Sequence, residues 1–255
     1  MKIQRLNMDN CWCIDFEDKT LLIDPWLKGA EVDYFSWFNK QWLRTTPVSP
    51  EDVSAYDYVV ITQKYPDHFH PETLLALKPK KLIVPESILT KVQSLLPDSE
   101  VVHFGSSPVQ LSDSKIRIHA LQSTRKMDPI YDALVIENNE ESIFLATHGF
   151  TEPDTWLDKL SSLPAVTLAF TPFDEYRLPS WLGGAVTPGL DAVKEMITSI
   201  KPQKIVATHD EDKIAKGLIS KLAKITRSPD ASILLKQELF KNRLLHITDY
   251  NWHTI

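Results

Sequence analysis

Short apolar runs separated by polar turns fill the first part of the chain. They predict strands over residues 2–6, 10–16 and 20–23, with a hairpin turn at 17–19. The series ends at Asp24-Pro25-Trp26. The aromatic-rich stretch from 32 to 42 keeps neither a helical nor a strand period, so we expect an irregular segment there.

From Tyr58 onward, apolar runs alternate with helical patterns. Strands are predicted over 58–61, 81–84, 101–104, 109–111, 116–121, 131–137, 142–146, 166–170 and 204–207, and near 233. Helices are predicted from 71, over 87–96, 152–160 and 188–200, and over 212–225. Several strands, such as 59–61 and 143–146, are apolar without alternation, which is typical of strands covered on both faces.

This order of elements, a β meander followed twice by β/α units, indicates the fold class. It predicts an α/β protein (α+β in some schemes) built as a four-layer αββα sandwich, with two sheets face to face and helices outside. No linker or repeat interrupts the chain. We therefore expect one domain over 1–255, made of two β/α halves of roughly 1–140 and 141–255.

Composition narrows the function classes. Hydrophobic residues make up 43% and charged residues 24%, as in ordinary globular proteins. The net charge of −6 argues against nucleic-acid binding, and no apolar run approaches the roughly 20 residues of a membrane span. The first residues lack the apolar core of a signal peptide, and Cys11 and Cys13 fit reduced packing residues. We therefore expect a cytoplasmic protein.

Polar residues follow several apolar strands where each strand ends in threonine. Thr62 precedes Asp67 and His68, Thr147 precedes His148, and Thr208 precedes His209. Ligands of α/β proteins bind at the carboxyl ends of strands, so strands of one direction would gather these groups at one edge. Carboxylate with imidazole suits zinc, iron or manganese. The alternative for residues 62–70 is a surface turn with a capping aspartate and two histidines that have no functional role.

The same segments carry a resemblance to the metallo-β-lactamase superfamily over nearly the whole chain. Residues 22–25 resemble the end of its opening meander, and 62–68 align with its His-x-His-x-Asp-His signature. Residues 145–149 match the strand end that carries its metal-bridging aspartate, and 206–209 match its final histidine strand. The resemblance implies an αββα fold and metal-dependent hydrolysis.

The chain also departs from this signature. Gln63 and Tyr65 stand where the family has its first two histidines, and Thr147 stands in place of the bridging aspartate. The resemblance therefore implies one divalent ion, zinc before iron or manganese. Its implied ligands are the retained family residues and one further histidine: Asp67, His68 and His209, completed by His148 or His70. An open position would hold a water, whose pKa a cation lowers from about 15.7 towards about 7.

Three residues are the catalytic candidates of such a site. Asp67 is one, and Gln63 and Tyr65 can hydrogen-bond the water or a substrate oxygen. Asp210 and Glu211 either orient His209 or form the acidic start of the helix predicted over 212–225.

The sequence leaves three functions open. The first is a metal-dependent hydrolase of a small molecule, the second a non-catalytic binding protein on this fold, and the third a non-hydrolytic iron enzyme. The aromatic residues between Tyr34 and Trp42 suggest a substrate that is apolar or ring-bearing in part. The same segment also fits a cluster packed on the domain, a pocket lid or a membrane-dipping loop. The sequence does not indicate an oligomeric state.

Overall fold

A computed structural model describes residues 1–123 and 132–255. The chain forms two compact units. Unit 1 comprises Met1–Gly105, Glu211–Lys221 and Thr248–Ile255, and unit 2 comprises Ser106–Asp210 and Leu222–Ile247. Each unit therefore contains segments that are distant in the sequence.

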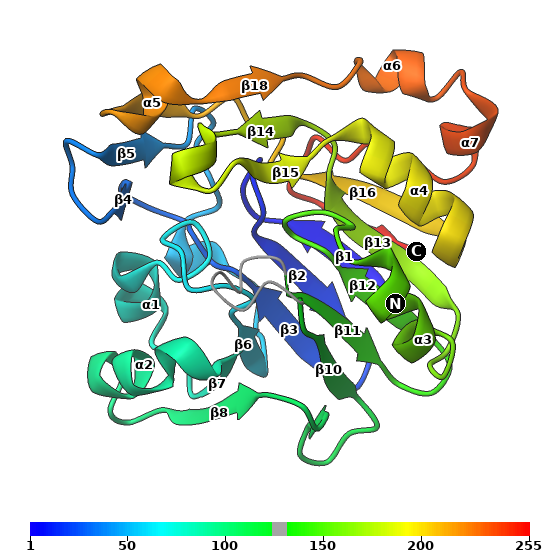
Figure 1. Cartoon of the computed structure of the whole chain (residues 1–255). Helices are drawn as coiled ribbons and strands as arrows, with labels where there is room; N and C mark the ends of the chain where they lie inside the picture. Colours follow the sequence, from blue (N-terminus) through cyan, green and yellow to red (C-terminus); the bar gives the residue numbers. More distant parts are fainter. Residues whose placement is uncertain (124–131) are drawn as a thin grey trace. The chain divides into compact units, whose positions relative to one another are not determined.

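The main sheet of unit 1 joins the opening meander to the first β/α unit (Figure 1). Its strand order is β19 (Trp252–Thr254), β1 (Lys2–Arg5), β2 (Trp12–Asp15), β3 (Thr20–Ile23), β6 (Tyr58–Val60), β7 (Lys81–Pro85) and β8 (Glu100–Phe104). The meander strands pair antiparallel, whereas β3, β6, β7 and β8 run parallel. The carboxyl ends of β3 and β6 consequently lie at the same edge.

A second sheet of unit 1 contains β17 (Ile214–Lys216), β5 (Asn39–Trp42) and β4 (Glu31–Asp33). The helical segments of this unit are η1 (Pro50–Asp52), α1 (Pro71–Leu77), η2 (Glu86–Ile88) and α2 (Leu89–Leu95). In Figure 1, α1 and α2 lie together beside β6 and β7. Fully buried apolar residues, including Leu22, Val59, Leu74, Leu82 and Val92, form the core of this unit.

Unit 2 is built on a second mixed sheet. Its strand order is β16 (Lys204–Thr208), β13 (Val166–Pro172), β12 (Ser142–Leu145), β11 (Ala133–Glu137), β10 (Arg117–Leu121) and β9 (Val109–Gln110). A smaller sheet contains β15 (Ala185–Pro188), β14 (Glu175–Arg177) and β18 (Lys224–Thr226). Because β12, β13 and β16 are parallel, their carboxyl ends share one edge.

Four helices of unit 2 contribute side chains to one core: α3 (Pro153–Leu160), α4 (Leu190–Ile200), α6 (Ala231–Leu234) and α7 (Glu238–Lys241). The short η4 (Ser180–Leu182) has no buried residue, and α5 (Ile219–Leu222) begins in unit 1 and ends in unit 2. The core packs the aromatic rings of Phe144, Phe150 and Trp156 edge to face. Edge-to-face packing is a preferred arrangement of buried rings.

The sequence predicted the meander and most of the strand–helix alternation correctly, but it was wrong after residue 211. The helix expected over 212–225 is replaced by β17, α5 and β18. Ile214–Lys216 pair with β5, and Gly217 at φ 110 ends this strand. The strand expected near 233 is helix α6, which begins with Asp230 capping the amide of Ser232. Tertiary pairing overrode the local pattern of 212–225.

Two other segments differ in detail. The strand expected over 131–137 is β11, and its first expected residue, Tyr131, lies outside the described residues. The segment expected to be irregular contains the hairpin of β4 and β5. At its turn, Tyr34, Phe35 and Trp37 are largely exposed, and Phe35 and Trp37 stack on each other. These three rings therefore contribute little to a cluster packed on the domain, which was one expectation for this segment.

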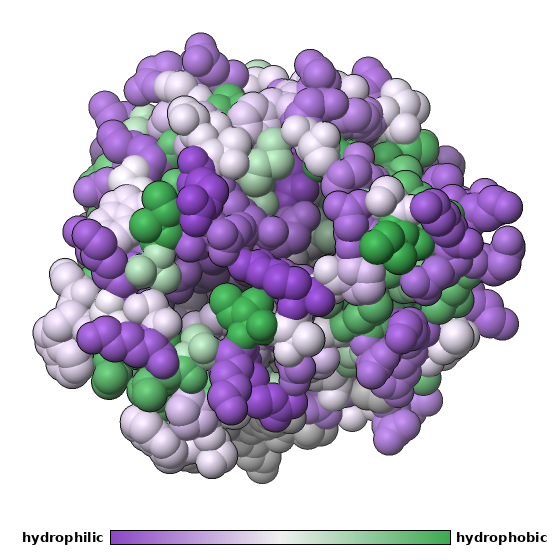
Figure 2. Space-filling model, turned by 90° about the horizontal axis from the view of Figure 1, so that it is seen from above, coloured by the Kyte–Doolittle hydropathy of each residue, from purple (hydrophilic) through white to green (hydrophobic). Residues whose placement is uncertain are grey.

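The surface shows no broad apolar area on the face in Figure 2. Hydrophobic residues appear there as separate small groups among hydrophilic ones, as far as the coloured residues show. Among the described residues, none of the helices has the length and apolar character that crossing a membrane requires.

Replacing Gly217 with alanine should destabilise the protein by about 1–3 kcal/mol, because the left-handed backbone is strained for other residues. A Cβ atom there would also lie 2.6 Å from the carbonyl oxygen of Phe38. Urea denaturation of both proteins measures the difference. Gly105→Ala is the control, since no atom lies within 4 Å of its added Cβ. Equal losses in the two variants would contradict this reading.

Candidate functional site

Two parallel strands of unit 1 deliver a polar cluster at one sheet edge. Ile23 of β3 is paired with Val60 of β6, so the next residues of both strands lie side by side. Asp24 follows β3 with a left-handed φ of 45°, and its amide donates to the carbonyl of Val60 at 3.0 Å. This turn directs the Asp24 carboxylate toward the segment after β6, in which Thr62 and His68 are its partners.

The Asp24 carboxylate is fully buried and accepts four hydrogen bonds. Oδ1 accepts from the amide of Thr62 at 2.7 Å. Oδ2 accepts from the Thr62 hydroxyl at 2.6 Å, from the Asn10 side chain at 2.9 Å and from His68 Nδ1 at 2.7 Å. Because a buried carboxylate is costly without partners, this network is what allows the charge to be buried.

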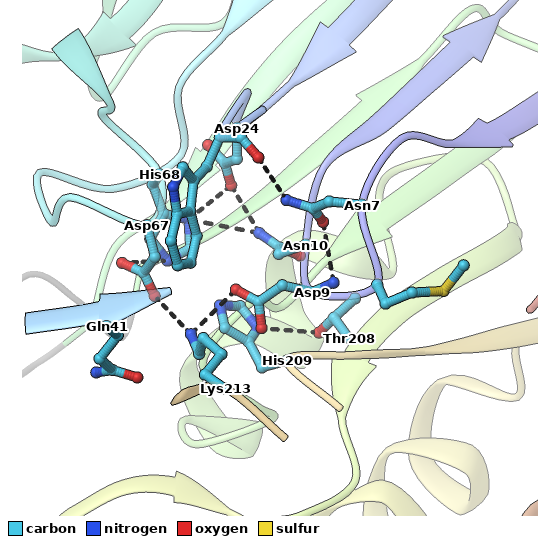
Figure 3. A network of polar contacts seen from close by, with 12 residues as sticks. Asn7, Asp9, Asn10, Asp24, Gln41, Asp67, His68, Thr208, His209 and Lys213 are labelled. Carbon is cyan, nitrogen blue, oxygen red and sulfur yellow. Dashed lines mark hydrogen bonds and ion pairs between the residues drawn. The ribbon is translucent and has the colours of Figure 1, made fainter. Parts of the chain in front are cut away.

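The contact with Asp24 fixes the orientation of His68 (Figure 3). A carboxylate only accepts, so Nδ1 carries a proton and Nε2 lies on the far side of the ring, 3.7 Å from Asp67 Oδ1. Burial by itself lowers the pKa of His68, but the carboxylates of Asp24 and Asp67 raise it to about 9. The two carboxylates therefore favour a positive charge beside them, at Nε2 of His68.

A second cation lies beside Asp67 in the same unit. Lys213 Nζ is 3.1 Å from Asp9 Oδ2 and 3.9 Å from Asp67 Oδ2, as the dashed lines of Figure 3 mark. It also lies 5.5 Å from the ring centre of Trp26. Burial lowers the pKa of Lys213, but Asp9, Glu31 and Asp67 together raise it above its ordinary value.

Glu31 is the third carboxylate of this cluster and is almost completely buried, with 3% of its surface exposed. Burial, together with repulsion by Asp67 and Asp9, raises the pKa of Glu31 from 4.5 to about 8, against the opposing attraction of Lys213. The cluster around Lys213 thus contains three carboxyl groups.

The remaining candidates of the 62–70 segment have different surroundings. Gln63 is buried and Tyr65 is half-buried, with Lys64 Nζ 5.1 Å from the centre of the Tyr65 ring. His70 caps α1, because Nδ1 accepts from the amide of Thr73. Its Nε2 lies 3.3 Å from the carbonyl oxygen of Ala30, to which it can donate. Both nitrogens of His70 thus have hydrogen-bond partners.

Unit 2 brings the two other candidate histidines together. His148 follows β12 and His209 follows β16, which both run parallel to β13. Their ring centres are 5.6 Å apart, and the rings are tilted by 39°. The structure thus brings these two histidines together within unit 2, beyond the carboxyl ends of parallel strands.

The turn geometry of both histidines is unusual. His209 has a φ of 53°, in the left-handed region that few residues other than glycine adopt. Its Nδ1 lies 3.3 Å from the hydroxyl of Thr208. After His148, Gly149 has a φ of 96°, and a Cβ there would lie 2.4 Å from Pro188. Only glycine fits this close approach.

The expectation that Asp210 and Glu211 form the start of a helix is wrong. No helix begins there in the described chain, which leads instead into β17. The Glu211 carboxylate accepts from the amide of Thr45 at 2.5 Å, and Asp212 pairs with Arg44 at 3.1 Å. Glu211 thus joins two segments of unit 1.

Sequence reasoning missed five residues of the unit 1 cluster: Asp9, Asn10, Asp24, Glu31 and Lys213. Asp24 carried a usable signal, because a carboxylate directly after the apolar strand 20–23 follows the same rule as the other strand ends. Lys213 carried no such signal. It is one of the 28 lysine and arginine residues of the chain, and it lies in a stretch that the sequence predicted as a helix.

Comparison with known proteins identifies the family. The family profile described as "Beta-lactamase superfamily domain" matches residues 5–209. A search of curated proteins finds no match to the sequence.

Several solved structures are similar to the chain. Isothiocyanate hydrolase from Delia radicum gut bacteria has a TM-score of 0.71 at 18% identity, covering 100% of this chain and 99% of that chain. A possible metal-dependent hydrolase from Veillonella parvula has a TM-score of 0.75 at 15% identity, with the same coverage. CmlA, a diiron β-hydroxylase from Streptomyces venezuelae, has a TM-score of 0.62 at 14% identity and covers 82% of this chain and 44% of its own.

These likenesses extend over the whole chain for the first two structures. At such low identity they establish the fold and not the activity. Together with the profile match, they confirm the fold class expected from the sequence, the metallo-β-lactamase-like α/β fold.

Glu31→Gln should stabilise the chelator-treated protein increasingly as the pH rises from 4.5 to about 8, the interval between the ordinary and the raised pKa of Glu31. In this interval the unfolded chain releases the proton of Glu31 while the folded chain keeps it, so the wild type loses stability with rising pH. Denaturant titrations at several pH values measure the difference. The exposed control Glu86→Gln should show no such trend. A Glu31→Gln difference independent of pH would contradict the raised pKa.

Proposed function

Because the chain belongs to the beta-lactamase superfamily, we propose that it is a metal-dependent hydrolase with a single divalent ion. The observation that carries this proposal is the contact of 2.7 Å between Asp24 and His68 Nδ1. Histidines that bind metals usually donate their other N–H to a carboxylate in this way. His68 is therefore oriented as a ligand through Nε2, beside Asp67.

We propose as ligands Asp67, His68 and His209, with His148 as the fourth. Support comes from each unit separately: Asp67 and His68 lie together in unit 1, and His148 and His209 lie together in unit 2. The left-handed backbone of His209 agrees with a functional role, since such strain gathers at functional sites. His70 is not part of this set, because both its nitrogens are engaged at the start of α1.

The donor atoms fit a borderline divalent cation. Carboxylate oxygen and imidazole nitrogen suit zinc, with iron and manganese as the nearest alternatives. Such an ion, when bound, supplies Lewis acidity and lowers the pKa of a water molecule. We propose zinc, and elemental analysis of purified protein identifies the metal directly.

The chain's own residues then bind and orient the reactants. Asp24 holds the Nδ1 proton of His68 and keeps its ring in one orientation. Gln63 has an amide that both donates and accepts, and Tyr65 has a hydroxyl that does the same. We propose that these two residues position the water or a substrate oxygen, in place of the imidazoles of the family signature.

The proposed substrate is a small molecule that is apolar or aromatic in part. Three exposed rings at the turn between β4 and β5, Tyr34, Phe35 and Trp37, offer flat apolar surface for such a group. Phe35 and Trp37 already stack with an interplanar angle of 6°. Hydrolysis assays with ester, amide and thioester libraries that include ring-bearing acyl groups test this preference.

Tag-free protein purified without chelator should contain about one equivalent of transition metal. Asp67→Ala and His209→Ala should each lower this content toward zero, because each removes a ligand. Elemental analysis by mass spectrometry measures it. A wild type that contains no metal after purification and zinc reconstitution would exclude this function in favour of a non-catalytic binding protein.

Two histidine variants serve as controls for the metal content. His253→Ala removes a partly exposed imidazole that contacts Asp249 and should leave the metal unchanged. His70→Ala should also retain the metal but lose about 1 kcal/mol of stability, because it removes a helix cap. Loss of metal from His70→Ala would assign that histidine to the ligands.

Asp24→Asn should lower metal affinity by about 10- to 100-fold while leaving the stoichiometry unchanged. The amide can present N–H to His68 Nδ1, so the orientation and tautomer of the ring are no longer fixed. Competition with a chromophoric chelator measures the affinity. Asp57→Asn, at an exposed site, is the control and should leave it unchanged. An unaltered affinity in Asp24→Asn would remove Asp24 from the site.

A further inference from the structure

Lys213 occupies a position in unit 1 at which a cation is surrounded by carboxylates. Asp9 is fully buried, Glu31 is 3% exposed, and Asp67 is half-buried. Nζ lies 3.1 Å from Asp9 and 3.9 Å from Asp67, and Glu31 acts on it electrostatically. The Lys213 side chain is 15% exposed, and a lysine is seldom so little exposed unless it is paired.

The small sheet of unit 1 explains how the lysine reaches this position. Both β4 and β17 pair antiparallel with β5, so their amino-terminal ends lie at the same end of the sheet. Glu31 begins β4, and Lys213 directly precedes β17. Gly217 at φ 110 then ends the strand after a few residues. The sheet thus sets the cation and one of its carboxylates beside each other.

The two oxygens of Asp67 face different groups. Oδ2 is the atom nearest Lys213, whereas Oδ1 is 3.7 Å from His68 Nε2. Asp9 Oδ2 binds Lys213, while its buried Oδ1 has no hydrogen-bond partner within the described ranges. Asp9 and Asp67 thus each present one carboxylate oxygen to Nζ, and carboxylate oxygens are the ligands that hard divalent cations prefer.

We propose that Lys213 Nζ is a built-in cation that fills a second cation position formed by Asp9, Glu31 and Asp67. The lysine balances the charges of Asp9 and Asp67 and directs Asp67 Oδ1 toward His68, which restricts the site to one exchangeable metal ion. This inference builds on the proposed ion at Asp67 and His68. It also makes a separate statement, that removing the ammonium opens a position for a hard divalent cation.

The experiment counts bound manganese in zinc-loaded protein by electron paramagnetic resonance. Mn²⁺ prefers oxygen ligands and binds more weakly than Zn²⁺ at nitrogen sites, so it leaves the zinc in place. Wild type should bind no Mn²⁺ beyond a non-specific background. Lys213→Ala and Lys213→Gln should each gain about one equivalent, because either change vacates the ammonium position while keeping the carboxylates.

Three further variants control this count. Lys213→Arg keeps the positive charge and should behave as wild type. Lys216→Ala removes a charge from the neighbouring strand, where the lysine contacts the Trp42 ring, and should also behave as wild type. Adding Asp9→Asn to Lys213→Ala should abolish the gained site.

Stability gives an independent readout. Without the lysine, mutual repulsion of the carboxylates should lower the melting temperature, and Mn²⁺ should restore it in Lys213→Ala but have no effect on wild type. If Lys213→Ala is unfolded when purified, Mn²⁺ in the refolding buffer should recover folded protein. Failure of that recovery overturns the inference, as does a folded Lys213→Ala that binds no more Mn²⁺ than wild type.

The outcome is distinct from that of the proposed function. Zinc content of the wild type tests the hydrolase metal site, whereas the difference in Mn²⁺ between Lys213→Ala and wild type tests the lysine. If wild type holds no zinc, the same comparison on chelator-treated protein still decides whether Lys213 fills a cation position.

Discussion

The buried contact between Asp24 and His68 is the interaction on which the site in unit 1 depends. A carboxylate and an imidazole, both with no exposed surface, must offset the loss of their hydration. They do so because Thr62 and Asn10 supply the other hydrogen bonds of Asp24. The network joins the ends of three segments of the main sheet. Removing one member leaves the others buried without partners, so its geometry is strongly determined.

Backbone strain accompanies the candidate groups in both units. Asp24 and His209 each follow a buried parallel strand directly and each has a left-handed φ, of 45° and 53°. Such a conformation costs a non-glycine residue of the order of 1–3 kcal/mol. In Asp24 the cost is offset by four hydrogen bonds within unit 1. A left-handed residue turns the chain at the end of the strand, so its side chain points in a different direction from that in a continued strand. The polar group is thereby held at the sheet edge.

The sequence predicted what depends on local patterns. Turn residues and apolar runs located the meander and the parallel strands, and the threonine-ended strands located His148 and His209, which the structure pairs in unit 2. The failures depend on partners distant in the chain. Residues 214–216 form a strand only because β5 is available to pair with them. Lys213 is a half-buried cation only because that pairing sets it among carboxylates from residues 9, 31 and 67. No local pattern carries such information, since a surface helix would show the same alternation of lysine and apolar residues.

Charge balance connects the unusual features of this chain. The signature positions held by Gln63 and Tyr65 have lost two neutral nitrogen ligands relative to the family pattern, but the carboxylates nearby remain. The carboxylates of Asp9, Asp24 and Asp67 would repel one another in this cluster without cations. His68 and Lys213 both carry raised pKa values because they meet this need from within the chain. A covalently attached ammonium cannot exchange or supply Lewis acidity, but it holds the carboxylates in place at every metal concentration. On this argument, the chain keeps one position for an exchangeable ion and fills the neighbouring one with a charge that it always carries.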